Sequence, residues 1–194
     1  MKQEAVIDFF NTLAPSWDAQ MIRDDRIITR ILDGAGVGEG DRVLDVATGT
    51  GVLIPDYLAR GVAHVTGIDL SPEMARIARD KYASDPRVEI LCADACTLPV
   101  DRCYDRIMIY NALPHFVSPA ALFAHLGRML APGGTLTVAH GFGRKKLDDH
   151  HRNTASDVSV PLPPTKELIS YLREYLDVTV VIDTEEMFQL TGMR

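Results

Sequence analysis

The chain has 194 residues, of which 46% are hydrophobic, and its formal net charge is -7. This length and apolar content can bury one sizeable core, so a single domain over residues 1–194 is expected. The acidic balance argues against a broad nucleic-acid-binding surface, which would need clustered basic residues. The one basic run, residues 144–146, is followed at once by Asp148 and Asp149.

Three cysteines, Cys92, Cys96 and Cys103, form an odd number without C-x-x-C spacing. We interpret them as small buried residues rather than metal ligands. The N-terminus lacks a basic segment followed by an apolar one, which would be typical of a secretory signal. The sequence therefore predicts a cytoplasmic protein in a reducing compartment, without a membrane span.

Two helices are expected before residue 34. The first has apolar residues at helical spacing, namely Val6, Phe9, Phe10 and Leu13. Residues 14–18 interrupt this pattern, and a second apolar face follows at Ile27, Ile28, Ile31 and Leu32. Residues 1–33 are thus expected to form an N-terminal helical lid, with Arg23, Arg26 and Arg30 facing solvent. Because the first apolar stripe could cover its own core or that of a second copy, a homodimer stays open.

The stretch from Val43 to Gly51 has the pattern of an apolar strand that runs directly into a glycine turn. A strand that closes on Asp45 suits burial on both faces, as in a parallel sheet. Gly49 and Gly51 let the backbone adopt dihedrals that a side chain would forbid and approach a ligand closely. A helix expected from about residue 52 to 60 would direct its free N–H groups at this turn, which predicts an anion cradle.

A second glycine-rich stretch, residues 34–40, follows a helical pattern and precedes a strand, so we interpret it as a helix end and linker. The dinucleotide fingerprint G-x-G-x-x-G would need a small residue at position 54, where this chain has Ile54 followed by Pro55. A nicotinamide cofactor is therefore not expected.

Residues 62–69 form a second expected strand, which ends in Asp69 one βαβ step beyond the glycines. A carboxylate at such a strand tip can accept both hydroxyl groups of a ribose. The alternative, a helix-capping role for Asp69, is disfavoured because Ser71, Pro72 and Glu73 already supply a cap, a first-turn proline and an acid. Asp94 follows a third strand, expected over residues 88–92.

A fourth strand, expected over residues 104–111, ends at Asn111 and leads to His115. His115 could act as a general base or orient a nucleophile, or it could be hydrogen-bonded at the strand end without any part in proton transfer. Ser118 then begins a helix whose inward face includes Leu130, and a fifth strand covers residues 135–140. Alternating β and α elements predict a right-handed, doubly wound α/β sheet with ligands across the carboxyl ends of its strands.

No hydrophobic period is visible from residue 141 to 163, and such long loops are usually functional or disordered. We expect a long substrate-side loop. Adjacent histidines on an extended segment point in opposite directions, so at most one of His150 and His151 can face a common site. A substrate or base role, a metal site with His115 and His140, and a solvated loop all stay open. Thr165 is expected to cap a last helix, which precedes a hairpin of two strands.

The run from Asp45 to Gly51 resembles the first motif of class I S-adenosylmethionine methyltransferases, acidic-x-G-x-G-x-G. Ala47 stands where that family usually has its first glycine, a departure that the ubiquinone/menaquinone C-methyltransferase branch commonly shares. The turn at residues 132–134 and the final hairpin are similar as well. The resemblance implies a Rossmann-like, doubly wound, mostly parallel sheet with helices on both faces and an antiparallel last strand.

The resemblance also implies S-adenosylmethionine as cofactor, S-adenosylhomocysteine as product and a small-molecule acceptor. Asp69 would bind the ribose, Leu70 the adenine face, and Asp94 with its neighbour Ala95 the adenine edge. The remaining implied cofactor contacts are Asp45, Ala47, Gly49, Gly51, Asn111 and Trp17. Trp17 and Asp18 would close over the cofactor, although packing of Trp17 on the core is the alternative.

The expected activity is therefore methyl transfer to a small molecule, with His115 and His151 as candidate catalytic residues and no predicted metal. Two alternatives remain: a non-catalytic S-adenosylmethionine-binding sensor or partner subunit, and an enzyme of this fold that transfers no methyl group. A nucleic-acid methyltransferase is disfavoured by the charge. The acceptor itself does not follow from the sequence, because a cofactor cradle reports only the donor.

Overall fold

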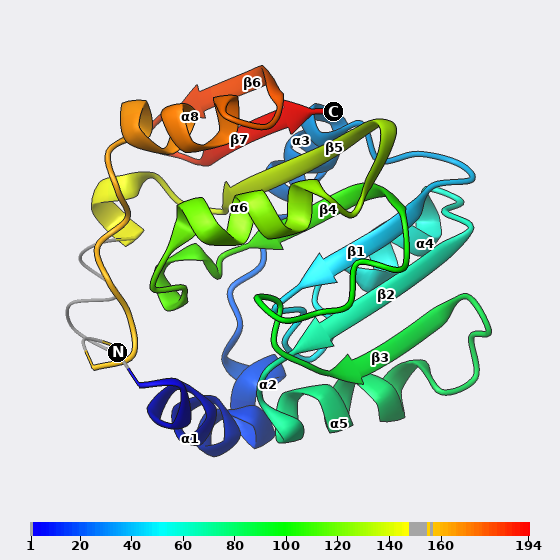
Figure 1. Ribbon diagram of the computed structural model, residues 1–194. Helices are drawn as coiled ribbons and strands as arrows, with labels where there is room; N and C mark the ends of the chain where they lie inside the picture. The colour runs from blue at the N-terminus through cyan, green and yellow to red at the C-terminus, as the bar shows by residue number, and fades with distance from the viewer. Residues whose placement is uncertain (1, 148–154, 156) are drawn as a thin grey trace.

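The computed structural model describes residues 2–147, 155 and 157–194. Its strands form one sheet in the order β3-β2-β1-β4-β5-β7-β6 (Figure 1). They are β1 (Arg42–Val46), β2 (His64–Asp69), β3 (Val88–Cys92), β4 (Tyr104–Tyr110), β5 (Leu130–His140), β6 (Asp177–Asp183) and β7 (Phe188–Met193). Strands β1 to β5 pair in parallel, and β7 is antiparallel to both β5 and β6. The expected mostly parallel sheet with an antiparallel last strand is confirmed.

Helices cover both faces of this sheet. On one face lie α3 (Asp25–Ala35), α4 (Ile54–Ala59) and α5 (Pro72–Tyr82), and on the other lie α6 (Pro119–Gly127) and α8 (Thr165–Arg173). Successive strand residues face opposite ways, so Val43 packs with the first group of helices and Leu44 with the second. Both side chains are fully buried, as expected for a parallel strand that is covered on both faces.

The N-terminal segment comprises α1 (Gln3–Leu13), the short 3-10 helix η1 (Ala14–Ser16) and α2 (Trp17–Gln20). Figure 1 shows α1 beside α5, near the carboxyl ends of β1, β2 and β3. The chain order along the sheet reverses between β1 and β4, and open α/β sheets bind ligands at such a switch point. The N-terminal helices therefore lie next to the place where a ligand is expected.

Local capping explains several helix boundaries. The Asp24 side chain accepts hydrogen bonds from the first-turn amides of α3, and α3 ends at Gly36, whose φ of 72° is left-handed. Residues 34–40 thus form the expected helix end. Ser71 and Ser118 cap α5 and α6 in the same way.

Some expected boundaries were wrong. Leu130, assigned to a helix, begins β5 and pairs with Tyr104, because α6 already ends at Gly127. Thr165 is the first residue of α8 rather than its cap, since its hydroxyl donates to the Asp183 carboxylate instead of accepting a backbone amide. In the segment expected to be a loop, residues 144–147 are helical. Leu147 is buried there, and the Arg144 Nη2 group bonds the carbonyls of residues 162 and 163.

The cysteines were also misjudged. Cys92, Cys96 and Cys103 are all exposed and free. Cys92 ends β3, which lies at one edge of the sheet, and the other two lie in the segment between β3 and β4. Within the part of the chain that the structure describes, no helix has the length and apolar character needed to span a membrane.

Candidate functional site

The turn after β1 holds its backbone in left-handed conformations. The φ angles are 56° at Ala47, 59° at Gly49 and 83° at Gly51. The Thr48 amide donates to the Ile68 carbonyl at 2.9 Å, which ties the turn to β2. A left-handed alanine costs roughly 1–2 kcal/mol, and such strain tends to occur at functional sites. The motif position where a glycine is usual thus keeps a glycine-like backbone.

Asp45 supports the turn from inside the protein. Its carboxylate accepts hydrogen bonds from the Thr48 hydroxyl at 2.6 Å and the Tyr57 hydroxyl at 3.1 Å. Burial raises the pKa of Asp45 to about 6, although both hydrogen bonds oppose the shift. Asp45 lines the cavity described below, and its hydrogen bonds also fix the shape of the turn.

Asp69 connects the glycine turn to the first turn of α5. One carboxylate oxygen accepts from the Gly49 amide and the other from the Ser71 amide, each at 2.8 Å. Burial raises the pKa of Asp69, while the hydrogen bonds from Ser71 and Gly49 lower it. A carboxylate has about four lone-pair sites, so Asp69 keeps acceptor capacity for a ligand hydroxyl group. Its chemistry therefore suits a ribose.

Asp94 follows β3 and lies next to the N-terminal helix. Its carboxylate accepts from the Cys96 amide and from the Gln3 side-chain amide, both at 2.8 Å. Leu70 and Ala95 line the same cavity as Asp94 and Asp69. The structure thus brings the implied ribose and adenine residues together from the ends of two neighbouring strands.

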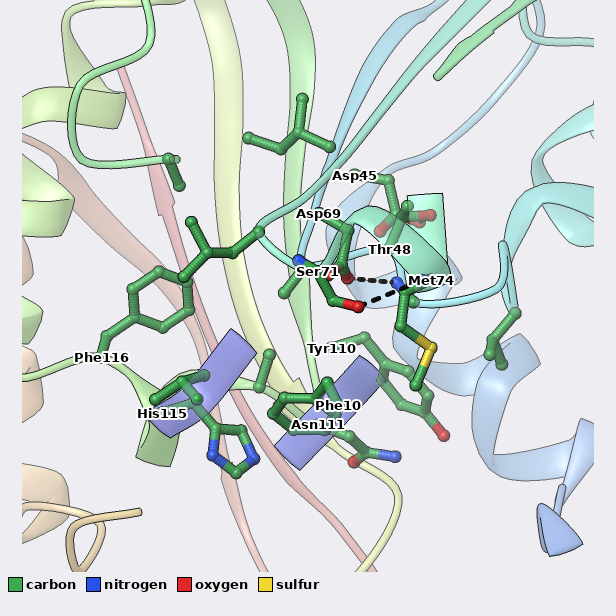
Figure 2. Close-up of a pocket in the computed structure, with 18 of the residues that line it drawn as sticks. Phe10, Asp45, Thr48, Asp69, Ser71, Met74, Tyr110, Asn111, His115 and Phe116 are labelled. Carbon is green, nitrogen blue, oxygen red and sulfur yellow. Dashed lines mark hydrogen bonds between the residues drawn. The ribbon is translucent and has the colours of Figure 1, made fainter. Parts of the chain in front are cut away.

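These residues surround a cavity of about 410 Å³, within the usual size range of small-molecule sites. Figure 2 shows Asp69 and Ser71 on one side and His115 and Phe116 on the other. The polar part of the lining is formed mainly by Asp45, Thr48, Asp69, Ser71 and Asp94. The apolar part comprises Val6, Ile7, Phe10, Met21, Ile22, Phe116 and Val117. Gly51, in contrast, packs behind the turn, where a Cβ atom would lie 2.5 Å from the Tyr82 ring.

Asn111 follows β4 at the switch point and is the second non-glycine residue with a left-handed backbone, with φ of 54°. Its side-chain oxygen accepts from the Gly141 amide, and its own amide donates to the Ala139 carbonyl, both at 2.9 Å. Asn111 also lines the cavity. It therefore links the ends of β4 and β5 beside the glycine turn.

His115 lines the cavity beside Phe116. Its Nδ1 atom is 2.8 Å from the Val158 carbonyl, and its ring packs edge-on against Phe10 with centroids 4.9 Å apart. Because a carbonyl can only accept, this contact places the proton of a neutral imidazole on Nδ1.

Trp17 and Asp18, which were expected to close over the cofactor, make different contacts. Trp17 lines the cavity and packs edge-on against Phe10 with centroids 5.9 Å apart. Asp18 accepts from the Thr50 hydroxyl and pairs with Lys81, both at 2.6 Å, so it attaches α2 to the glycine turn and α5. Val6 packs with Ala155 and Val158, so the lid and the long segment meet over the site.

Sequence reasoning missed Arg23. It was expected to face solvent, yet it lines the cavity and its guanidinium bonds the Val52 carbonyl at 2.8 Å and Asp56 at 2.6 Å. Arg23 precedes α3, so its position depends on contacts with α4 that no local pattern reveals. Phe10 was identified only as a helix-face residue, since its contact with His115 joins distant parts of the chain.

The candidate His151 lies outside the described residues, as do His150 and Arg152. His140 is fully buried, and its ring centroid is 6.1 Å from that of Phe188. Among residues 2–147, 155 and 157–194, no group of three potential ligands from His, Cys, Asp and Glu could hold a metal ion.

Comparison with known proteins gives matches to methyltransferases. A model described as a methyltransferase domain matches residues 43–134. A demethylmenaquinone methyltransferase of Clavibacter sepedonicus is 39% identical over 100 residues, which cover 51% of this chain and 40% of that protein. This chain spans between 30% and 59% of the lengths of three curated relatives, which are two demethylmenaquinone methyltransferases and a tuberculostearic acid methyltransferase.

Solved structures show the same fold. One belongs to the Haloferax volcanii complex between the Trm112 methyltransferase activator and a methyltransferase, with a TM-score of 0.81, 22% identity and coverage of 97% of this chain and 96% of that one. Another is the complex of DhpI with S-adenosylhomocysteine, with a TM-score of 0.77, 22% identity and coverage of 99% and 96%.

Proposed function

Because this chain belongs to the class I S-adenosylmethionine-dependent methyltransferases, we propose that it transfers a methyl group from S-adenosylmethionine to a small-molecule acceptor. One observation carries the proposal: the Asp69 carboxylate, which can still accept ribose hydroxyls, holds the amide of the left-handed Gly49 at 2.8 Å beside the cavity. Ribose recognition and close backbone approach are thereby combined in one place.

The residues around the cavity fit the chemical groups of the cofactor. Asp69 would hold the ribose hydroxyls, Asp94 and Ala95 the adenine edge, and Leu70 the adenine face. Ala47, Gly49 and Asn111 would contact the methionine portion, and Asp45 and Gly51 would keep the turn in shape. Trp17 would close the site. When bound, S-adenosylmethionine supplies an electrophilic methyl group on a positively charged sulfur atom.

The apolar residues that line the cavity support a compact apolar acceptor. Phe10, Phe116 and Val117 line it, and the cavity also includes Ile22, which is 87% exposed, while Val117 is 69% exposed. We propose His115, which lines the cavity, as the residue that takes the acceptor's proton, and we keep His151 as a second candidate. Alignment of the acceptor behind the methyl group would contribute most, about 7–11 kcal/mol of the barrier, whereas a positioned base contributes about 10²- to 10⁴-fold.

Residues 1–33 and 141–163 would act as closing segments of a single domain over residues 1–194. Closure excludes water and strengthens electrostatic interactions inside the site. We further propose a cytoplasmic location, supported by three exposed free thiols that suit a reducing compartment. The net charge of -7 supports an acceptor other than nucleic acid. Whether the chain pairs with a second copy can be measured by sedimentation.

The test is calorimetric titration with S-adenosylmethionine, S-adenosylhomocysteine and a nicotinamide dinucleotide. Micromolar binding of the adenosyl ligands alone is expected. Asp69→Ala should weaken that binding roughly 100-fold or more, because hydrogen bonds to a charged group are lost. Asp101→Ala, at an exposed position in the segment before β4, is the matched control.

Because Asp69 also holds two backbone amides, circular dichroism must show that the variant is folded, and Asp69→Asn provides a milder change. Unaltered affinity in both folded variants would refute the ribose assignment. An acceptor screen, read by release of S-adenosylhomocysteine, then separates an enzyme from a sensor that binds the cofactor without turnover. Product mass identifies any reaction other than methyl transfer.

A further inference from the structure

Helix α1 completes the N-terminal cap of α5. The Asn11 side-chain oxygen accepts from the Ser71 hydroxyl at 2.7 Å and from the Glu73 amide at 3.2 Å. Ser71 in turn accepts from the Met74 amide at 3.1 Å. The free amides of a helix start need such partners, and here two side chains from separate helices share the task.

The same first turn orients Asp69. The Ser71 amide donates to one Asp69 oxygen, and the other oxygen accepts from Gly49, each at 2.8 Å. Ser71 is only 1% exposed, so its hydroxyl has few alternative partners. Figure 2 shows Asp69, Ser71 and Met74 close together at the polar part of the cavity lining. A continuous set of hydrogen bonds therefore runs from Asn11 through Ser71 and Asp69 to the glycine turn.

Helix α1 also reaches the second carboxylate of the site. The Gln3 side-chain amide donates to Asp94 at 2.8 Å. Gln3 and Asn11 stand near opposite ends of α1, about 12 Å apart at 1.5 Å per residue. One helix thus contacts Asp94 directly and Asp69 through Ser71, which are the two carboxylates proposed for the adenosyl group.

We propose that Asn11 is a positioning residue for adenosyl binding. By fixing the Ser71 hydroxyl and the Glu73 amide, it holds the first turn of α5 in the place from which Ser71 directs the Asp69 carboxylate at the ribose hydroxyls. Without Asn11, the Glu73 amide and the Ser71 hydroxyl lose their acceptor, and the carboxylate is less well oriented before the ligand arrives. The inference rests on the proposed function, because it assumes that Asp69 binds a ribose.

The experiment compares S-adenosylhomocysteine with its 2′-deoxyadenosyl counterpart by calorimetry. Asn11→Leu has nearly the same size but no acceptor, and it should weaken binding of S-adenosylhomocysteine by about three- to tenfold, the value of one ordinary hydrogen bond. Binding of the deoxy ligand should fall clearly less, because the interaction that Asn11 supports is already reduced. Asn11→Asp keeps an acceptor oxygen near a helix N-terminus and should restore the wild-type ratio.

Thr12→Ala is the matched control, because Thr12 is an exposed neighbour on α1 whose hydroxyl bonds only its own helix at Asp8. It should leave both affinities unchanged. Equal weakening of both ligands in Asn11→Leu would mean that Asn11 merely packs, and unchanged affinities would mean that it has no role; either result overturns the inference. If the wild-type chain binds neither ligand, the proposed function itself fails.

Discussion

At the scale of single residues, backbone strain is concentrated at the ends of the two central strands. Ala47 follows β1 and Asn111 follows β4, with φ of 56° and 54°, and they are the only non-glycine residues with positive φ among those described. Both line the cavity. The sheet thus holds unfavourable conformations where close approach to a ligand is needed.

Substitution of Gly51 tests how tightly the glycine turn packs against Tyr82. Gly51→Ala would place a Cβ atom at φ of 83°, 2.5 Å from the Tyr82 ring and 3.0 Å from Ile54. Gly40→Ala is the control, because its φ is 80° and its Cβ atom would meet no described heavy atom within 4 Å. Gly51→Ala should therefore lower the free energy of unfolding by about 1–3 kcal/mol more than Gly40→Ala, measured by urea denaturation. Equal losses would show that Tyr82 moves aside freely.

Asp45 should make stability depend on pH. Its pKa is raised to about 6 in the folded protein from an ordinary value of 3.8. The folded state then holds a proton that the unfolded state has released, so this contribution is complete below about pH 4 and is lost as the pH rises through about 6. Relative to Asp45→Asn, the wild-type free energy of unfolding should fall by roughly 3 kcal/mol over that range. A constant difference between the two proteins from pH 4 to 7 would contradict the raised pKa.

At the scale of elements, α2 is attached by contacts with α5 and the glycine turn. Burial raises the pKa of Asp18, but hydrogen bonds and charge from Lys81, together with the Thr50 hydroxyl, outweigh it, so the pKa lies below its ordinary value. Lys81 also donates to the Thr50 carbonyl at 3.0 Å. One lysine of α5 therefore holds both α2 and the glycine turn.

Lys81→Met should loosen α2. Hydrogen exchange of amides in residues 14–20 should become about two- to fivefold faster, because the ion pair is partly exposed and such pairs contribute modestly. Exchange in α3 should stay the same. Lys166→Met, at an exposed position on α8, is the control and should change neither segment. Unaltered exchange in residues 14–20 would show that aromatic packing of Trp17 on Phe10 holds α2 without the ion pair.

At the scale of the whole molecule, the site joins segments from most of the chain, including α1, the ends of β1 to β4 and the segment near Val158. A ligand that bridges them should stabilise the folded state as a whole. At 100 times its dissociation constant, S-adenosylhomocysteine should add about 2.7 kcal/mol and raise the melting temperature by roughly 5–10 °C. Scanning calorimetry measures this shift, and Asp69→Ala should reduce it. An unchanged melting temperature at saturation would contradict selective binding to the folded chain.

The sequence by itself determined the order of elements and the place of the site. Strands β1 to β4, the helix starts at Ser71 and Ser118, and the glycine turn follow from local patterns, because periodicity and capping depend on near neighbours. Asp69 and Asp94 could be identified as candidate ligand-binding residues because Asp69 ends β2 and Asp94 follows β3. The carboxyl ends of these parallel strands meet at one edge of the sheet.

Only the tertiary structure decided which side chains meet there. The contacts of Gln3 with Asp94, Asn11 with Ser71 and His115 with Val158 join residues 91, 60 and 43 positions apart. No local period relates such residues, since their proximity depends on how α1 and the segment after β5 pack over the finished sheet. For the same reason the exposure of the cysteines and the bonds of Arg23 were misjudged, because burial is a property of the packed molecule and not of the residue type.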